Sequence, residues 1–443
     1  MVELRWKLSL AVLLLVVLSL AAGCAQQGTH TNETLKIGVV ASMTGPASTT
    51  GKDIWQSAVI AAEEINAKGG VYVKDLGTRV PIELVLGDDE STREGGQKAV
   101  SRLITQDGVH VLVGGFSSAV VSAHQAIVAE HGIPYIITGA STPAVTRRTD
   151  IDTRTMFHYC PTTDDYGEQT TLFAYDVIRP AINERFGFPD SRPLRMALVI
   201  QDSPYGKGVQ KAVKDTIEKR GLRIEIVAEE TYKMGETDFR TPLSSVKAAG
   251  PDVVYPAAFL NEQIPMVTQA RRDVGLDTIF LAVECNDDPD YYAGLGKYGE
   301  YSVIETRFSP YAIPRGPVAD DMVAFRENFH KRWGSYPGMM GASTYEGIYI
   351  AARAVEEAGT RDKAAVTRAL SSLEMPQLVE AMQGGVIRFT PDAREAKFEL
   401  FFEQLVWDEK AGALRPRIVW PAHMKETDFV LPDWYVPGQA ASP

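Results

Sequence analysis

Residues 109–142 read VHVLVGGFSSAVVSAHQAIVAEHGIPYIITGAST, and this stretch decides the fold class. Apolar runs at 109–113 and 135–138 predict two strands, and the segment between them predicts a glycine- and serine-rich loop followed by a helix that ends at Gly132. Two strands joined by a helix of this length lie parallel in one sheet, because parallel strands need a long crossover connection. The stretch therefore predicts one strand–helix–strand unit of an α/β fold.

The same order of signals recurs at residues 252–286, where a strand, a loop and a helix lead to a second strand at 278–281 and a loop at 283–286. Further strand signals occur at 35–41, 81–86, 195–200 and 224–228, and helical spacing occurs at 54–65, 97–107 and 205–220. Strands in hairpins are expected at 386–389, 398–407 and 414–420. We therefore predict an α/β protein with two doubly wound lobes built on parallel-type sheets.

The loops that follow the strands are the expected place for a ligand, because ligands of open α/β sheets bind beyond the carboxyl ends of the strands. In the first half these are the loops at 116–118 and 139–142, and in the second half they are the loops at 259–260 and 283–286. If the two lobes face each other, all four loops meet at one cleft.

The loops of the first half carry small residues and hydroxyl groups, which let a ligand approach the backbone and can donate hydrogen bonds. A helix that begins near Ser118 also presents free N–H groups and a positive dipole to a carboxylate. The loop of the second half carries one acid, Glu284, in the otherwise apolar run FLAVEC. Donors on one wall and a single anion on the other predict a site for a zwitterion.

In this arrangement the ligand carboxylate contacts Ser117, Thr142 and nearby N–H groups, while its ammonium contacts the Ala140 carbonyl, the Thr142 hydroxyl and Glu284. Two simpler interpretations stay open. Ser117 and Ser118 can serve only as helix N-caps, and Glu284 can be an ordinary solvated carboxylate at a strand end.

The composition excludes several other functions. The 443 residues include 45 Lys and Arg against 57 Asp and Glu, for a net charge of −12 with no basic concentration that would bind nucleic acid. Three cysteines are too few for a disulfide scaffold or a cysteine-rich zinc site. The run GLGKYG at 294–299 follows no strand, so it predicts a loop or helix end. With no nucleophile elbow either, we expect no enzymatic activity, no cofactor and no metal.

The first residues predict the compartment. Residues 8–22 form an apolar run that is short for a membrane span but suits a secretory signal. The run LAAGC at 20–24 resembles the lipobox of bacterial lipoproteins, which implies a signal peptide at 1–23, lipidation of Cys24 and a polar tether at 24–34. An ordinary signal peptide with an incidental cysteine is the alternative. We expect a protein outside the cytoplasm, anchored to a membrane by its N-terminal lipid.

Six short motifs occur in order along the chain: TGP at 44–46, INAKGG at 65–70, DD at 88–89, SS at 117–118 with ASTP at 140–143, DSPYG at 202–206, and QAR at 269–271 with GL at 275–276. Over residues 35–420 they make the chain resemble the leucine-isoleucine-valine binding proteins of ABC importers, which have the type I periplasmic binding fold. The resemblance implies a ligand site formed by Ser117, Ser118, Ala140, Ser141, Thr142, Tyr205, Phe259 and Glu284. Phe259 falls where the family often has a pocket tyrosine, so a branched-chain preference stays open.

The resemblance also implies two lobes joined by a three-stranded hinge. Lobe 1 comprises residues 35–156 and 309–384, and lobe 2 comprises residues 157–308 and 385–443. Cys160 and Cys285 both fall in lobe 2, and the sequence does not place them within disulfide distance. We expect free thiols, although pairing stays open.

The implied function is capture of an amino acid, branched-chain or related and possibly aromatic, between the closing lobes of a monomer, with delivery to an ABC permease. Two alternatives stay open: a sensory ligand-binding module for a membrane receptor, and a binder of an amide or an aromatic acid. Because Glu284 reaches the ammonium only after closure, we predict that Glu284→Ala weakens amino-acid binding about tenfold or more and leaves the fold intact.

Overall fold

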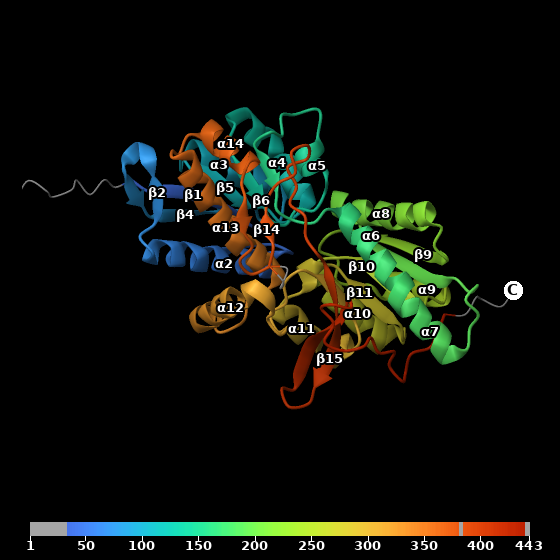
Figure 1. Ribbon diagram of the computed structural model, residues 1–443. Helices are drawn as coiled ribbons and strands as arrows, with labels where there is room; N and C mark the ends of the chain where they lie inside the picture. Colours follow the sequence, from blue (N-terminus) through green and yellow to red (C-terminus); the bar gives the residue numbers. More distant parts are fainter. Residues whose placement is uncertain (1–32, 381–383, 439–443) are drawn as a thin grey trace, which may run out of the picture. The chain divides into compact units, whose positions relative to one another are not determined.

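The computed structural model describes residues 33–380 and 384–438. The expected signal peptide, Cys24 and most of the tether lie outside the described residues. The compact unit from residue 35 onward contains two large sheets, each covered by helices, as Figure 1 shows. These sheets agree with the predicted α/β class. We call the five-stranded sheet with the helices packed on it the first-sheet half, and the seven-stranded sheet with its helices the second-sheet half.

The first sheet has five parallel strands in the order β4-β1-β5-β6-β7. Their bounds are β1 Leu35–Ala41, β4 Ile82–Asp88, β5 Val111–Gly114, β6 Tyr135–Ile137 and β7 Met156–His158. β1 lies between β4 and β5, with Ile37 opposite Leu84 on one side and Val111 on the other. Nearly every residue of β1 is buried, because helices cover both faces of a parallel sheet.

The second sheet has seven strands in the order β16-β15-β12-β11-β10-β8-β9. Their bounds are β8 Leu194–Gln201, β9 Ile224–Tyr232, β10 Val253–Ala257, β11 Ile279–Ala282, β12 Val303–Thr306, β15 Phe401–Asp408 and β16 Ala413–Trp420. Strands β8 to β12 pair in parallel, whereas β15 is antiparallel to both β12 and β16. The sheet is therefore mixed, with the predicted C-terminal hairpin at its edge.

Two small antiparallel pairs complete the strands: β2 Val71–Val73 with β3 Thr78–Val80, and β13 Met375–Pro376 with β14 Val386–Ile387. The α-helices are α2 Ser48–Ala67, α3 Arg93–Thr105, α4 Ser118–His131, α5 Ala144–Arg147, α6 Thr163–Phe173, α7 Arg179–Phe186, α8 Pro204–Arg220, α9 Arg240–Ala248, α10 Leu260–Gln269, α11 Pro289–Leu295, α12 Ala319–Trp333, α13 Met339–Ala358 and α14 Lys363–Ser371. The glycine-rich run at 294–299 is the end of α11 and a short 3₁₀ turn, as expected.

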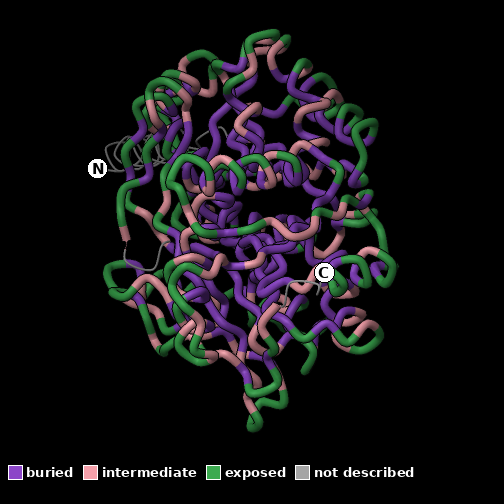
Figure 2. The backbone as a smooth tube through the Cα atoms, turned by 90° about the vertical axis from the view of Figure 1, so that its right-hand side faces the viewer, coloured by how far each residue is buried: buried purple, intermediate pink, exposed green. Residues whose placement is uncertain are grey.

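Local sequence explains where the helices begin and end. The Ser203 hydroxyl accepts a hydrogen bond from the Gly206 N–H at 3.2 Å, and Pro204 occupies the first turn of α8, where its missing N–H costs nothing. Gly132 and Gly221 end α4 and α8 in the left-handed conformation. Figure 2 shows the buried residues gathered in the interior and the exposed residues on the outer helices and loops.

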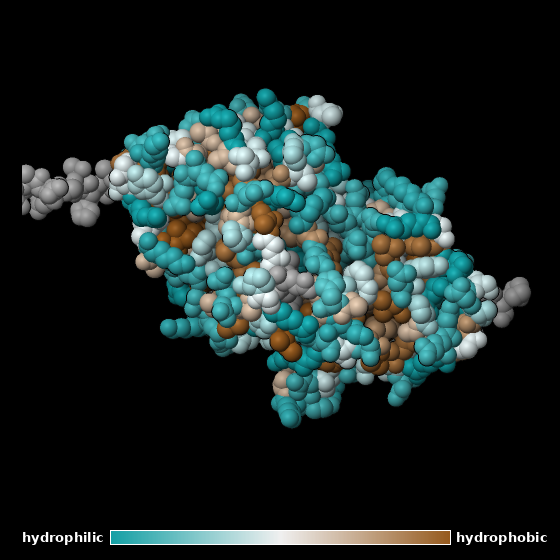
Figure 3. Space-filling view, viewed as in Figure 1, coloured by the Kyte–Doolittle hydropathy of each residue, from teal (hydrophilic) through white to brown (hydrophobic). Residues whose placement is uncertain are grey.

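The chain passes between the two sheets three times: after β7, after β12 and after β14. Between the second and third passages it forms α12, α13 and α14, and α13 packs against α2 and β5 of the first sheet. The face drawn in Figure 3 is mostly hydrophilic, with hydrophobic side chains gathered in the right-hand part of the view, below the place where Figure 1 labels α6. The residue boundaries of the two lobes remain a prediction.

Candidate functional site

A sharp turn after β5 brings the chain into α4 at the carboxyl end of the first sheet. Gly114 and Gly115 have φ angles of 105° and 82°, which favour glycine. A side chain at Gly115 would also lie 2.2 Å from the Tyr135 hydroxyl oxygen. Ser117 is the N-cap of α4, but its side chain makes no capping hydrogen bond. The first-turn N–H groups of α4 therefore remain uncapped by that hydroxyl.

A small cavity lies where the strand-end loops of the two sheets meet. It is lined by Phe116, Ser118, Gly139, Ser141, Tyr166, Tyr205, Phe259, Val283, Cys285 and Met340. All four loops that the sequence marked as strand ends contribute to this lining, together with residues from α6, α8 and α13. The cavity measures about 10 Å³, which is the space of a single water molecule.

Aromatic rings from both halves fill the space around this cavity. Phe116 follows β5 of the first sheet and Phe259 follows β10 of the second, and their ring centroids are 4.5 Å apart. Tyr205 stacks on Phe259 with centroids 5.4 Å apart and planes inclined by 19°. The two halves therefore touch directly through aromatic side chains in this conformation.

The structure brings four of the eight predicted ligand residues to the cavity wall: Ser118, Ser141, Tyr205 and Phe259. The other four, Ser117, Ala140, Thr142 and Glu284, are buried nearby but do not line it. The Thr142 N–H donates to the Ser118 hydroxyl at 3.2 Å, and the Ala140 N–H donates to the Gly115 carbonyl at 3.0 Å. These residues hold the loops in place around the cavity.

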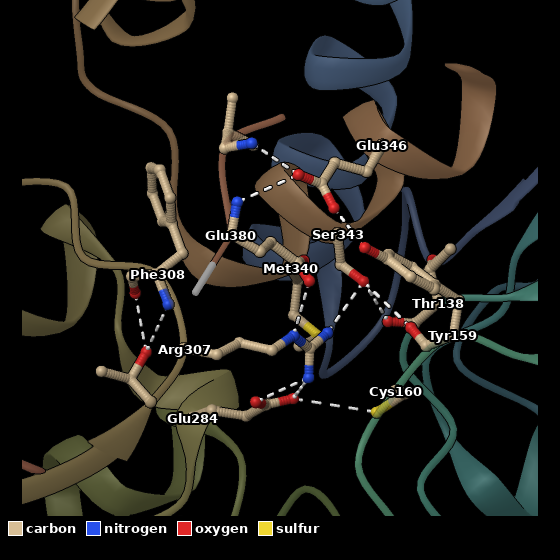
Figure 4. A network of polar contacts seen from close by, with 12 residues as sticks. Thr138, Tyr159, Cys160, Glu284, Arg307, Phe308, Met340, Ser343, Glu346 and Glu380 are labelled. Atoms are coloured by element: carbon tan, nitrogen blue, oxygen red, sulfur yellow. Dashed lines mark hydrogen bonds and ion pairs between the residues drawn. The ribbon is translucent and has the colours of Figure 1, made fainter. Parts of the chain in front are cut away.

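The Glu284 carboxylate does not line the cavity, and both of its oxygens are bound by protein partners, as Figure 4 shows in part. One Arg307 nitrogen, Nη1, donates to both of its oxygens, at 2.6 and 2.7 Å. The Tyr166 hydroxyl donates to Oε1, and the Cys160 thiol lies 3.7 Å from the same oxygen. Glu284 and Arg307 are both completely buried.

Arg307 is held in turn by residues of the first-sheet half. Its Nε donates to Glu380 at 2.9 Å, and its Nη2 donates to the Ser343 hydroxyl at 2.9 Å. Burial lowers the pKa of Arg307, but the carboxylates of Glu284 and Glu380 outweigh it and raise that pKa well above the usual value. Arg307 is therefore a permanent cation between two acids.

The same burial acts on the acids. Burial raises the pKa of Glu284, and the Arg307 guanidinium and the Tyr166 hydroxyl oppose that rise. Burial likewise raises the pKa of Glu380 to about 8. The Arg307 guanidinium opposes the rise of the pKa in both acids, and it donates hydrogen bonds to both.

These contacts correct the expectation of a lone acid on the second wall. Glu284 is neither alone nor solvated, because Arg307 already neutralises it. Sequence reasoning missed Arg307, although one signal was available: it stands between the strand-like run VIET and Phe308, and an arginine at the end of a buried strand must find an acid. Tyr166 and Met340 were also missed, and no motif marks either of them.

One lining residue keeps a polar atom without a partner. The Tyr205 hydroxyl is buried at the cavity wall and makes no hydrogen bond within the described residues, although the Cys285 thiol lies beside it. Cys160 and Cys285 are free, buried thiols, as expected. Within residues 33–380 and 384–438, no group of three or more His, Cys, Asp and Glu side chains is arranged to hold a metal ion.

A sequence profile described as "Periplasmic binding protein" matches residues 34–409, which is most of the chain. The chain belongs to this family. The family places the protein outside the cytoplasm, and its members are substrate-binding proteins rather than enzymes. The resemblance found in the sequence is thereby confirmed.

Relatives in the family bear names of the same kind. An amino acid binding protein of Pseudomonas aeruginosa is 28% identical over 346 residues, covering 78% of this chain and 84% of that protein. A Leu/Ile/Val-binding protein homolog 7 of Brucella abortus is 26% identical over 387 residues, covering 84% of this chain and 88% of that protein.

Solved structures show the same fold. The branched-chain amino acid transporter substrate-binding protein LivJ of Streptococcus pneumoniae, in complex with isoleucine, has a TM-score of 0.72 at 21% identity and covers 88% of this chain and 100% of that chain. The type I periplasmic binding fold is therefore shown for this chain. In the part of the chain that the structure describes, every helix is too short or too polar to cross a bilayer.

Proposed function

We propose that this solute-binding protein captures a small carboxylate-bearing molecule, an amino acid or a related organic acid, between its two sheets. The observation that carries the proposal is the cavity itself. Its lining combines strand-end loops from both sheets, serine hydroxyl groups on the first-sheet wall and aromatic rings from both halves. The names of the relatives support the same ligand class.

In the proposed complex the ligand carboxylate accepts hydrogen bonds from Ser118 and Ser141 and from the first-turn N–H groups of α4. The helix dipole favours an anion there. Ala140 and Thr142 keep these loops in position through their backbone N–H groups. The body of the ligand lies against Phe259 and Tyr205.

Capture requires the two halves to separate, because the closed cavity has room for about one water molecule. A ligand favours the closed state only when it contacts that state better than the open one. A carboxylate on the first-sheet half and a side chain against Phe259 on the second-sheet half provide such a difference.

The binding proposal is tested by a thermal-shift screen of the twenty amino acids and a panel of small carboxylic acids, because a ligand stabilises the folded state by mass action. Ser141→Ala should weaken binding of the best carboxylate about tenfold or more, since a hydrogen bond to a charged group is lost. Ser244→Ala is the matched control, because that exposed hydroxyl only donates to the Arg240 carbonyl in α9. If no carboxylate stabilises the protein, the proposal fails.

The lipid anchor and the transporter belong to the same proposal. Cys24 would carry the lipid, residues 24–34 would tether the folded part to the membrane, and the closed form would deliver its ligand to an ABC permease. Cys24→Ser should move the protein from the detergent phase to the aqueous phase in a Triton X-114 partition. Unchanged partitioning would contradict the anchor but would leave ligand capture standing.

A further inference from the structure

We propose that the ligand is a small aromatic carboxylic acid without an ammonium group, and that Arg307 permanently occupies the place on Glu284 where a ligand ammonium would bind. This inference rests on the proposed function and narrows its ligand class. It departs from the zwitterion that the sequence alone predicts.

The first step is that protein partners already bind both oxygens of the Glu284 carboxylate. Both oxygens accept hydrogen bonds from Arg307 Nη1, and one of them also accepts from the Tyr166 hydroxyl. The carboxylate is completely buried and does not line the cavity. A ligand ammonium could reach Glu284 only by displacing Tyr166 and Arg307.

The second step is that Arg307 is held in place by its other contacts. Its other nitrogens are bound by Glu380 and by the Ser343 hydroxyl, and its guanidinium lies 4.3 Å from the ring centroid of Phe398. The Ser343 hydroxyl in turn donates to the carbonyls of Thr138 and Tyr159. Arg307 is therefore fixed by a built network, and moving it would leave a buried cation unpaired.

The third step is the character of the cavity that remains. Its ten lining residues include no Asp, Glu, Lys or Arg. An ammonium group would be buried there without an anion, which is costly. A carboxylate finds donors at Ser118, Ser141 and the start of α4 on the first-sheet wall, and the Tyr205 hydroxyl on the opposite wall is a further donor.

The rings indicate the shape of the ligand body. Tyr205 and Phe259 are stacked, and Phe116 meets Phe259 from the opposite half. When the halves open, the contact between Phe116 and Phe259 is lost, and a flat ring bound between them would replace it with contacts to both rings. The ligand that fits both features is a carboxylate on an aromatic ring or on a short link to one.

The decisive experiment compares matched ligands on the unmodified protein by calorimetry. We expect 3-phenylpropanoate to bind at least about tenfold more tightly than L-phenylalanine, which differs only by the ammonium group. The neutral 3-phenylpropanamide should not bind measurably, and 4-methylpentanoate should bind more weakly than 3-phenylpropanoate. Tighter binding of L-phenylalanine would overturn the inference and leave the proposed function intact. Absence of binding by every carboxylate would overturn both.

A pair of variants tests the role of Arg307. Arg307→Gln frees Glu284, so the preference for 3-phenylpropanoate over L-phenylalanine should fall about tenfold or more. Arg192→Gln is the matched control, because Arg192 forms a comparable two-bond pair with buried Asp252 in the second-sheet half, at 2.8 and 2.9 Å. Its preference should be unchanged. An unchanged preference in folded Arg307→Gln would overturn the assignment, and if that variant does not fold, the comparison on the unmodified protein decides.

Discussion

Replacing Asp288 by asparagine should stabilise the protein at neutral and alkaline pH, because it removes one of two buried acids that face each other between the halves. Asp53 lies on α2 of the first-sheet half, and Asp288 precedes α11 of the second. A methyl group at Gly338 would lie 2.5 Å from an Asp288 oxygen and 3.0 Å from an Asp53 oxygen, so both carboxylates occupy the space in front of that glycine. Asp290 is a further acid beside them.

The sign of the effect follows from the pKa of Asp53. Burial raises that pKa from 3.8 to about 7, despite hydrogen bonds from the Gly338 and Gly341 N–H groups. Burial and then the charge of Asp53 raise the pKa of Asp288 as well. The folded protein therefore holds protons that the unfolded chain has already released. The free energy of unfolding therefore has its full contribution from these protonated acids below about pH 4, and it loses that contribution as the pH rises through about 7.

The magnitude follows from the same shift. Three pKa units correspond to about 4 kcal/mol for Asp53, and the pKa of Asp288 is likewise raised by burial. Asp288→Asn removes that second buried carboxyl, which should gain about 1–3 kcal/mol at pH 8. Asparagine is as good an N-cap as aspartate, so the hydrogen bond that Asp288 accepts from the Asp290 N–H at 2.7 Å can persist. Its amide can also donate to Asp53. Little gain is expected at pH 5, where Asp53 is already protonated.

The assay is urea denaturation at pH 5 and pH 8, with Asp362→Asn as the control. Asp362 is also a helix N-cap, accepting from the Ala365 N–H at 2.9 Å, but it has no buried acid opposite it. The control should change stability equally at both pH values. A gain for Asp288→Asn that is the same at pH 5 and pH 8, or no gain at all, would refute the reasoning.

Four further substitutions address other parts of the structure. Arg307→Met should lower the free energy of unfolding by about 3–5 kcal/mol in urea melts, since it leaves Glu284 buried without a cation. Glu284→Ala should also destabilise the fold, contrary to the expectation from sequence, because it removes one of the two acids that pair with buried Arg307. An unchanged urea melt would contradict the prediction for either variant. Asn261→Ala should favour the open form and weaken ligand binding about fivefold, because its side chain donates to the Pro46 carbonyl across the two halves at 2.5 Å; small-angle scattering with no change in radius of gyration would argue against this. Gly115→Ala should cost about 1–3 kcal/mol, since φ is 82° there and the new methyl group meets the Tyr135 hydroxyl; a normal melting temperature would contradict that.

Local sequence patterns were sufficient for most of the fold. The run at 35–41 became β1 with the same bounds, and the repeated strand–helix–strand order at 109–142 and 252–286 became neighbouring strands of the two sheets. These predictions depend on apolar periodicity and on glycines that end helices, and both signals are contained within a few neighbouring residues. The mixed character of the second sheet was not predicted in full, because the pairing of β15 with β12 joins residues about a hundred positions apart.

The site was predicted only in part from the sequence. The sequence marked all four loops around the cavity, because each directly follows a strand. It did not predict the pairing of Glu284 with Arg307, which depends on β11 lying beside β12, with Leu281 opposite Val303 and Ala282 opposite Ile304. This register places the two strand ends next to each other, and only then do an acid and a base 23 residues apart become partners.

The position of Arg307 links ligand class to the connection between the halves. It directly follows β12, where the chain passes from the second sheet to the first, and it binds Glu380 near the third passage. Through Ser343 it also reaches the carbonyl of Tyr159, which follows β7 at the first passage. A ligand ammonium that displaced Arg307 from Glu284 would therefore disturb contacts at all three passages. A ligand without an ammonium would leave these contacts intact while the halves open and close, which is a second physical reason, independent of the cavity lining, for the proposed preference for an organic acid over an amino acid.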